Sequence, residues 1–229
     1  MQAVILAAGI GKRMRPLTLE RPKPLIEVAG KLLIEHVLDA LPSEIDEIIL
    51  VVGYKGEMIR QHLGEAYHGI PLRYVYQWMP AGTAHSLSIA RPFIKGTFLM
   101  LNADDIIGTK ALAQAIKEPL AILVARHDHP EKMGVVSVKT DGTLDSIVEK
   151  PEHPVGNLIN TNSLVLDERI FGYEAPRHES GEYYVTDPLN AMAKDLPVKV
   201  IEQPLWIPVG CPEDIPAAEE ELKKHNLPE

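Results

Sequence analysis

The stretch MQAVILAAGIGKRMRPLTLERPKPLIEV, residues 1–28, joins a short apolar run to a glycine-rich turn crowded with cations. Residues 2–8 are mostly apolar and predict a buried β-strand. Gly9 and Gly11 follow, where a strand leaving a sheet must turn sharply and can bring its backbone N–H groups to a ligand. Residues 12–23 then carry five cations and one acid, in a chain of net charge −9. These cations, which suit a polyphosphate ligand, are Lys12, Arg13, Arg15, Arg21 and Lys23.

Two familiar phosphate-binding patterns do not fit this turn. A P-loop requires G-x-x-x-x-G-K-[ST], which Gly9 and the residues after it do not supply. The dinucleotide pattern G-x-G-x-x-G fails because Met14 stands at the third glycine position. A turn followed by a solvated loop is the simpler alternative, and it stays open for Lys12 and Arg15.

Further motifs follow along the chain in a fixed order. The N-terminal pattern L-A-A-G-x-G-x-R-M-x-P-L-T leads into P-K-P-L and G-K-x-L-I. Later segments are QWMPAGTA at 77–84, NADD at 102–105, MGVV at 133–136, EKP at 149–151 and GEYYVTD at 181–187. The ordered set resembles the motifs of the sugar-1-phosphate nucleotidylyltransferases, also called nucleoside-diphosphate-sugar pyrophosphorylases.

Composition is compatible with this resemblance. A chain of 229 residues that is 45% hydrophobic can bury one substantial core. The single Cys211 excludes an intramolecular disulfide, and no run reaches the roughly 18 apolar residues of a membrane span. The start is interrupted by glycine and cations too early for a signal peptide. We therefore expect a cytoplasmic protein with no membrane partner and, given its acidic balance, no nucleic-acid partner.

Strand-like and helix-like runs alternate through the first half of the chain. The expected strands are 3–8, 47–53, 72–77, 97–101 and 120–125, with helical patterns at 33–41, 58–63, 83–90 and 111–116. Strands without regular helices follow at 135–139, 144–149 and 158–166, and then helices at 185–194 and 212–225 with a strand at 198–202. This alternation predicts an α/β fold whose sheet is covered on both faces.

Pattern and resemblance together predict a single Rossmann-like three-layer domain over residues 1–229, with a mixed, mainly parallel central sheet. Residues 1–130 would form a nucleotide-binding half and residues 131–229 a β-rich half that binds the sugar phosphate. Open α/β sheets bind ligands at the carboxyl ends of their strands, so the motifs that follow these strands should meet in one site.

The resemblance implies attack by a sugar phosphate oxygen on the α-phosphorus of a nucleoside triphosphate, with release of pyrophosphate. A sugar phosphate, with a second pKa near ~6, is mostly a dianion at neutral pH and needs no general base. The obstacle is repulsion between polyanions, which positioned cations and backbone donors offset. By resemblance Lys23 meets the α-phosphate and Lys150 the sugar phosphate. Gly9, Gly11 and Arg13 would hold the β- and γ-phosphates, and Ala7 and Ala8 are further expected contacts of the nucleotide.

Asp104 is the candidate ligand for Mg²⁺, because it follows an apolar strand where a carboxylate can meet phosphate oxygens. The alternative role for Asp105 is the cap of a helix or turn, because helical residues follow soon after it. The family usually carries a second aspartate in W-x-D-x-G-T-P-E, where this chain has Pro208. Either Asp104 works with water and phosphate alone, or catalysis is weakened, or another acid substitutes: Asp105, Asp187 or Asp214.

The base and sugar sites follow from the same resemblance. Gln77 can offer a donor and an acceptor to a nucleobase, Gly82 would let the base lie against the backbone, and Thr83 follows in the same motif. The expected sugar-phosphate contacts are Gly134, Glu149, Lys150 and Asn160. The family's tyrosine before Gly134 is Met133, and Asn162 and Leu164 replace the glycine and tyrosine of N-x-G-x-Y. We therefore expect an altered sugar pocket.

The sequence thus predicts a magnesium-dependent nucleotidylyltransferase that makes an NDP-sugar from an NTP, UTP or dTTP being favoured, and a sugar 1-phosphate. Two alternatives stay open. One is a cytidylyltransferase acting on a phosphate such as choline or inositol phosphate. The other is a non-catalytic paralogue that binds nucleotide or sugar phosphate without turnover. The nucleobase, the acceptor and assembly as a homodimer are also left open.

Overall fold

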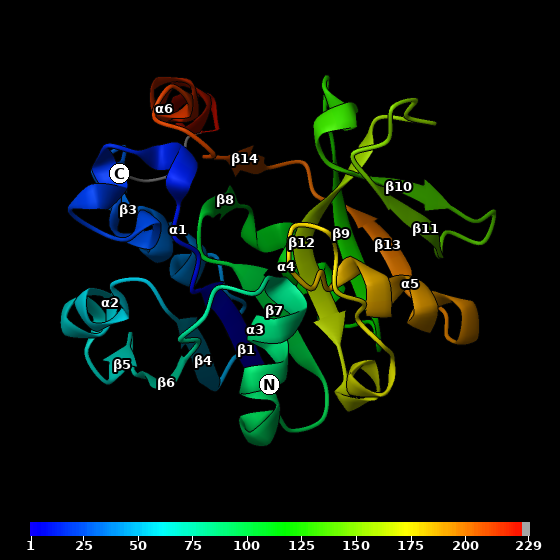
Figure 1. Cartoon of the computed structure of the whole chain (residues 1–229), viewed down its shortest axis with the longest axis horizontal. Coiled ribbons are helices and arrows are strands. Elements are labelled where there is room, and N and C mark those ends of the chain that lie inside the picture. Colours follow the sequence, from blue (N-terminus) through cyan, green and yellow to red (C-terminus); the bar gives the residue numbers. More distant parts are fainter. Residues whose placement is uncertain (226–229) are drawn as a thin grey trace.

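The computed structural model describes residues 1–225, and its centre is one ten-stranded mixed sheet (Figure 1). The strand order is β11-β10-β12-β7-β1-β4-β6-β5, with β9 beside β12 and β13 beside β9. The parallel part of this path consists of β7 (Phe98–Asn102), β1 (Gln2–Ala7), β4 (Glu47–Val52) and β6 (Ile70–Tyr76). The predicted mixed α/β fold is confirmed, and the parallel strands are those expected from the first half of the sequence.

Antiparallel pairing dominates the second half. Its strands are β9 (Ala121–Arg126), β10 (Gly134–Val138), β11 (Leu144–Glu149) and β12 (Leu158–Leu166), while β13 (Lys199–Glu202) runs parallel to β9 and β5 (Ala66–Tyr67) forms an edge with β6. Strand β12 joins the halves, because it pairs with β7 at its end, with β10 at Ile159 near its start and with β9 along most of its length.

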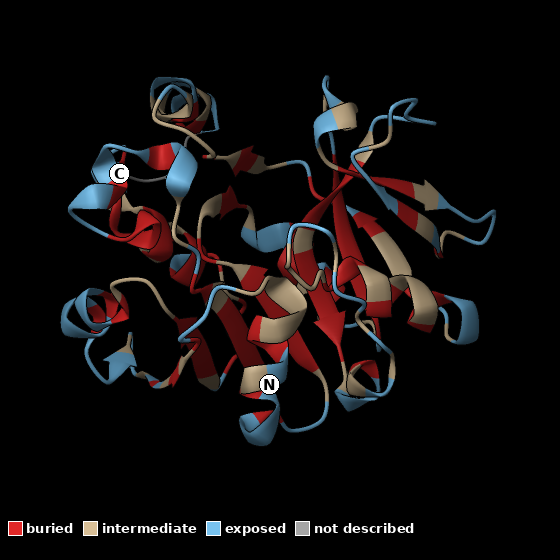
Figure 2. Ribbon diagram, viewed as in Figure 1, coloured by how far each residue is buried: buried red, intermediate tan, exposed pale blue. Residues whose placement is uncertain are grey.

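Side chains along β1 alternate between the two faces of the sheet, and helices cover each face, which gives three layers. Ala3, Ile5 and Ala7 point into a core shared with α1 (Leu33–Asp39), α2 (Gly56–Leu63) and α4 (Thr109–Ala115). Val4 and Ala8 point the other way, into a core shared with α3 (Thr83–Ala90) and α5 (Thr186–Asp195), which lie in front of the sheet in Figure 1. Both faces of the strand are therefore buried, and Figure 2 shows the middle strands of the sheet in red, whereas its outer strands are partly exposed.

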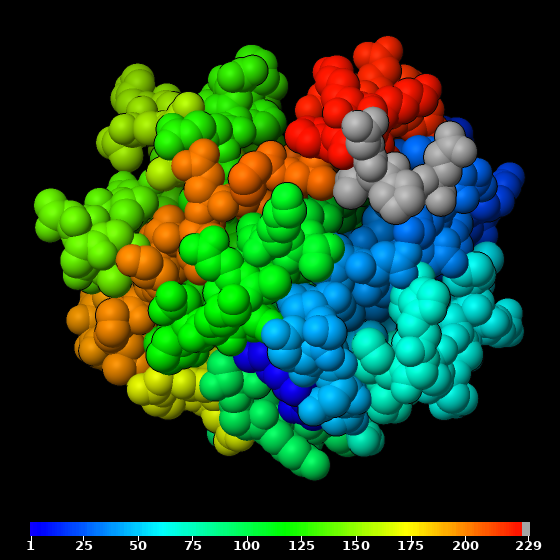
Figure 3. Space-filling model, turned by 180° about the vertical axis from the view of Figure 1, so that it is seen from behind, coloured from blue at the N-terminus to red at the C-terminus, as the bar shows by residue number. Residues whose placement is uncertain are grey.

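A third, smaller core lies beside the N-terminal segment. The hairpin of β2 (Glu27–Val28) and β3 (Lys31–Leu32) packs there against α6 (Asp214–Lys224), and the backbone N–H of Ala29 donates to Glu219 Oε1 at 3.2 Å. From behind, α6 and the N-terminal segment form neighbouring red and blue surfaces (Figure 3). The end of the described chain thus returns to the first half of the sequence, so the two sequence halves are interleaved in space. No helix within residues 1–225 has the length and apolar character needed to cross a bilayer.

Five short strands were not expected, namely β2, β3 and β5, described above, and two more. β8 (Asp105–Ile107) and β14 (Trp206–Pro208) pair antiparallel, and in this register Asp105 stands opposite Pro208. The interpretation of Asp105 as a helix or turn cap is wrong: it begins β8, and the residue before α4 is Gly108. A three-residue strand leaves too short a pattern for periodicity to detect.

The loop before α3 is tied to the loop before α5. Tyr183 N donates to Ala81 O at 2.9 Å, and Ala84 N donates to Tyr183 O at 3.0 Å. Gly82 makes this approach possible, because a Cβ there would lie 2.4 Å from Tyr183 O. Its φ of 88° also disfavours other residues. Gly82 is thus required by contact with Tyr183, a reason that differs from the expected contact with a base.

Gly82→Ala should lower the free energy of unfolding by at least about 2 kcal/mol, since it adds both a clash and backbone strain. For a chain of this size that corresponds to a melting temperature lower by roughly 4–8 °C. Gly172→Ala is the matched control, because a Cβ there meets nothing within 4 Å and its φ is not positive. Equal melting temperatures for the two variants would contradict this role of Gly82.

Candidate active site

The turn after β1 is shaped by close packing around Gly11. Its φ is 66°, and a Cβ there would lie 3.0 Å from Thr18 Cγ2 and 3.1 Å from Lys23 Cβ. Thr18 Oγ1 donates to Gly11 O at 2.9 Å, and the fully buried Met14 anchors the short 3₁₀ turn Lys12–Met14 that follows. The glycine-rich segment is therefore a fixed turn with its cations displayed beside it.

A pocket of about 590 Å³ opens above this turn. Four cationic side chains and two carboxylates line it: Lys12, Arg13, Lys23, Arg177, Asp104 and Glu182. Gly9 and Gly11 form its floor together with Ala7. Of the two loop cations left open by the sequence, Lys12 lines this pocket, whereas Arg15 is exposed and does not. Such a concentration of cations favours a polyanionic ligand.

Lys23 and Asp104 form the central ion pair of the pocket. The Lys23 Nζ–Asp104 Oδ2 distance is 2.6 Å, and Lys23 is only 8% exposed. Lys23 lies in a 3₁₀ turn (Lys23–Leu25), while Asp104 follows the end of β7. The pair therefore joins the basic N-terminal segment to the centre of the parallel sheet.

Arg13 crosses from the turn toward the loop before α6. A Cβ added at Gly210 would lie 3.5 Å from Arg13 Nη1 and 3.3 Å from Asp214 Oδ2, so glycine leaves room for both side chains. Asp214 Oδ2 itself accepts the N–H groups of Gly210 and Cys211 at 2.7 and 2.9 Å. Its carboxylate is therefore occupied in shaping this loop.

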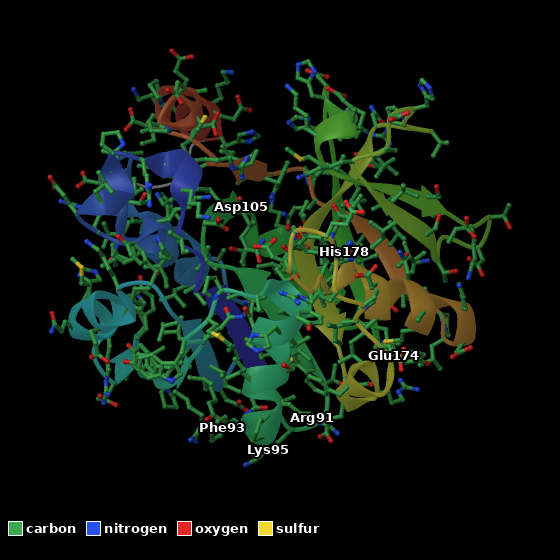
Figure 4. All side chains as sticks on the ribbon, viewed as in Figure 1. Arg91, Phe93, Lys95, Asp105, Glu174 and His178 are labelled. Carbon is green, nitrogen blue, oxygen red and sulfur yellow. The ribbon has the colours of Figure 1, made fainter. Side chains whose placement is uncertain are left out.

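Asp105 lies next to the ion pair, on β8. Its Oδ2 accepts a hydrogen bond from Trp206 Nε1 at 3.1 Å. Withdrawal from water, followed by repulsion from neighbouring Asp104, raises the pKa of Asp105 above its ordinary value of 3.8, against the smaller opposing effects of Lys23 and Arg13. Asp187, by contrast, is paired with His178 at 2.7 Å. Of the three acids considered as substitutes for the missing aspartate, Asp105 is the one adjacent to Asp104, and Figure 4 shows it on the opposite side of the site from His178.

A second pocket of about 240 Å³ shares Gly9, Asp104 and Glu182 with the first. Four of the residues predicted to contact the nucleotide line it: Ala8, Gln77, Gly82 and Thr83. The buried amide of Gln77 is fixed from both ends, because Nε2 contacts His85 Nδ1 at 2.7 Å and Oε1 accepts from Ser86 Oγ at 2.8 Å. One amide proton has only a long contact to Gly82 O at 3.4 Å, so Gln77 keeps both donor and acceptor capacity.

The predicted sugar-phosphate residues form a separate group. Gly134 and Glu149 are cross-strand partners on β10 and β11, and a Cβ at Gly134 would lie 3.0 Å from Glu149 Oε1. Lys150 follows with a φ of 45° and donates its N–H to Met133 O at 2.9 Å. Asn160 is buried in a bulge of β12, where its amide pairs with Asn162. These four residues do not line either pocket.

Several residues that line the larger pocket were not predicted as site residues. Arg177, Ser180 and Gly181 come from the irregular segment before α5, and Gly210 comes from the loop before α6. Irregular segments have no period, so apart from the motif at 181–187, which begins with Gly181, only their charge could have indicated a role. Glu182 and Tyr184 also line the site, and they are hydrogen-bonded to each other at 3.0 Å.

Comparisons with known proteins agree with this arrangement. The family profile of the nucleotidyl transferases matches residues 2–225. The chain belongs to the nucleotidyl transferase family. It is similar to the UTP–glucose-1-phosphate uridylyltransferase AglF of Haloferax volcanii, at 32% identity over 98% of this chain and 97% of that protein. A crystal structure assigned as a glucose-1-phosphate thymidylyltransferase of Bacillus anthracis has the same fold, with a TM-score of 0.88, 23% identity and coverage of 100% of this chain and 98% of that one.

Other nucleotidyl transferase relatives are longer. The bifunctional protein GlmU of Methanococcus maripaludis is 33% identical over 95% of this chain and 53% of its own length. The GlmU of Methanocaldococcus jannaschii is 35% identical over 94% of this chain and 52% of its length. The chain therefore spans about half the length of these relatives.

Asp105 should make stability depend on pH. An acid whose folded pKa is raised keeps its proton in the native state after the unfolded chain has released it, so stability falls as pH rises above the ordinary value of 3.8. Asp105→Asn removes this titration. The free energy of unfolding of the native protein minus that of the variant should therefore fall by on the order of 1 kcal/mol between pH 4 and 7, measured by urea denaturation. A difference that stays constant or rises would contradict the raised pKa.

Proposed function

We propose that this nucleotidyl transferase moves a nucleoside monophosphate from an NTP to a sugar 1-phosphate and releases pyrophosphate, with UTP or dTTP as the favoured donor. The observation that carries the proposal is the pocket in which Lys12, Arg13, Lys23 and Arg177 surround the Gly9–Gly11 turn beside Asp104. The similarity to AglF along almost its whole length supports UTP and a hexose 1-phosphate as the first pair to test.

The reaction forms one phosphorus–oxygen bond and breaks another. A phosphate oxygen of the sugar phosphate attacks the α-phosphorus, and the bond from that phosphorus to the β-bridging oxygen breaks, so pyrophosphate leaves with the electron pair. No proton has to be removed from the attacking dianion. The chain's task is to hold two polyanions together, which requires cations and N–H donors fixed before the ligands arrive. The packed turn around Gly11 and the buried stem of Lys23 meet that requirement.

The donor set also fits Mg²⁺. Asp104 supplies a partly exposed carboxylate at the pocket, and carboxylate oxygens are ligands that Mg²⁺ prefers, whereas Asp105 follows it in the chain with its side chain bonded to Trp206. Bound there, the ion would neutralise phosphate charge and polarise the phosphoryl oxygens. Asp104 would hold the ion, and Lys23, whose ammonium lies 2.6 Å from Asp104 Oδ2, would meet the α-phosphate.

Gln77, Gly82 and Thr83 would receive the nucleoside in the adjoining pocket. The amide of Gln77 is held in one orientation by Ser86 and His85, so it presents a fixed donor and acceptor to a base edge. Lys150, Glu149, Gly134 and Asn160 would receive the sugar phosphate from the second half, with Lys150 meeting its phosphate.

A panel measuring pyrophosphate release from each NTP with several sugar 1-phosphates, in the presence of Mg²⁺, tests the proposal. Within the active pair, Arg13→Ala and Lys23→Ala should each lower kcat at least ~100-fold, the usual loss for one positioned charge-stabilising donor. Arg15→Ala is the matched control: it comes from the same loop, is exposed outside the pocket, and should stay within a few fold of the native rate. Near-native rates for Arg13→Ala and Lys23→Ala would exclude the phosphate role of this turn.

Position 208 separates catalysis from simple binding, because Pro208 stands where the family has an aspartate and faces Asp105 across the β8–β14 pair. Asp104→Asn should abolish metal-dependent turnover, and calorimetry should show weaker Mn²⁺ binding. Pro208→Asp should bind Mn²⁺ more tightly and keep or raise turnover, while losing stability without metal because like charges then face each other. A native protein that binds nucleotide without turnover, and gains turnover in Pro208→Asp, would show a non-catalytic binder instead.

A further inference from the structure

Arg177 extends over the phosphate pocket from the segment that precedes α5. It lines the same pocket as Gly11, Arg13 and Lys23, although it belongs to the opposite half of the sequence. The other three cations of this pocket all come from residues 12–23. Arg177 is therefore the cation by which the second half of the chain reaches the phosphates.

The guanidinium is placed by its own loop. Arg177 Nε donates to Gly181 O at 3.4 Å, and a Cβ at Gly181 would lie 3.3 Å from Arg177 Nη2. Gly181 has a φ of 84°, which lets the guanidinium lie against its backbone. The loop is closed by His178 N donating to Glu182 O and Gly181 N donating to His178 O, at 3.0 and 2.8 Å. These backbone contacts shape the loop that carries Arg177, and the Gly181 carbonyl gives its guanidinium one contact within that loop.

Arg177 keeps its charge and most of its donors available. Some exposed arginines elsewhere in the described chain hold carboxylates, as in Arg169–Asp167 at 2.6 Å and Arg126–Glu202 at 2.9 Å, whereas others such as Arg91 do not. Within residues 1–225 no carboxylate lies at ion-pair distance from Arg177, although Glu182 lines the same pocket. The Glu182 carboxylate instead accepts a hydrogen bond from Tyr184. A guanidinium has five N–H donors, and only one of them has a protein acceptor here, through a long contact.

We propose that Arg177 is a phosphate-contacting residue of the reaction, donating to phosphoryl oxygens in the pocket that Arg13 and Lys23 also line. The inference rests on the proposed function, because it assigns a phosphate of the substrates to this pocket. A planar fork of donors matches two oxygens of one phosphate, and such charge-assisted hydrogen bonds are stronger than neutral ones. The cations of this pocket come from both halves of the chain, so they lie together at the place where both substrates would meet. The phosphate belongs to the NTP or to the sugar phosphate, and the binding experiments below distinguish these sources.

The test compares the full chain with Arg177→Gln and Arg177→Lys in Mg²⁺, using calorimetry with UTP and, separately, with glucose 1-phosphate. Arg177→Gln should weaken one of the two ligands at least about 10-fold, the effect of one lost hydrogen bond to a charged group. Arg177→Lys should recover part of that loss, because it keeps the charge without the fork. Arg91→Gln is the matched control. Its guanidinium lies 5.2 Å from the Phe171 ring centre, and Figure 4 shows it at the end of the molecule away from Asp105.

Weakened UTP binding would assign Arg177 to the donor's phosphates, and weakened glucose 1-phosphate binding would assign it to the acceptor. Melting temperatures of Arg177→Gln and Arg91→Gln should match that of the native protein, which separates ligand contact from folding. Native-like affinity of Arg177→Gln for both ligands would overturn the inference while leaving the proposed function intact. Absence of turnover in the native protein, with affinity still lost in Arg177→Gln, would overturn the proposed function alone. A native protein that bound neither ligand would overturn both.

Discussion

The Lys23–Asp104 ion pair is the interaction on which the candidate site depends. Four cations line one pocket, and their mutual repulsion opposes keeping them together in the free protein. Asp104 offsets part of that repulsion at 2.6 Å, from a strand end that cannot move without disturbing β7 and its neighbours β1 and β12. The site thus holds its cations near one another without neutralising them all. A polyanion that binds in the pocket can replace the contact between Lys23 and Asp104 with stronger contacts to the cations.

The interleaved chain explains how two sequence halves supply one site. The parallel strands β1 and β7 bring the glycine turn and Asp104 to the same edge of the sheet. The hydrogen bond between Ala81 and Tyr183 then places the segment before α5 against the loop before α3. That segment carries Arg177 and Glu182. Because Gly82 permits this hydrogen bond, one glycine positions residues that lie about a hundred positions later in the chain. Fold stability and the shape of the phosphate pocket are coupled through this contact.

Much of the fold could be predicted from the sequence because its signals are local. Apolar runs such as 47–53 and 97–101 became β4 and β7 within one or two residues, and the turn at Gly9 and Gly11 does face a pocket with Arg13 and Lys23. What could not be predicted depends on contacts between distant residues. The β8–β14 pair, the clamp of Gln77 by His85 and Ser86, and the reach of Arg177 exist only once the chain is folded. The sequence motifs identified the candidate residues, whereas the residues that contact them could be identified only from the structure.

Pro208 stands where related sequences usually have an aspartate, and the charges of the residues around Pro208 give a physical reason for this difference. Cross-strand residues on one face stand about 5 Å apart, so an acid at 208 would face Asp105 closely. Withdrawal from water, followed by repulsion from Asp104, already raises the pKa of Asp105. An acid at position 208 would add to that repulsion whenever no cation was bound. Pro208 adds no charge opposite Asp105, so the acids beside the Lys23 ammonium are Asp104, at 2.6 Å, and its neighbour Asp105 on β8.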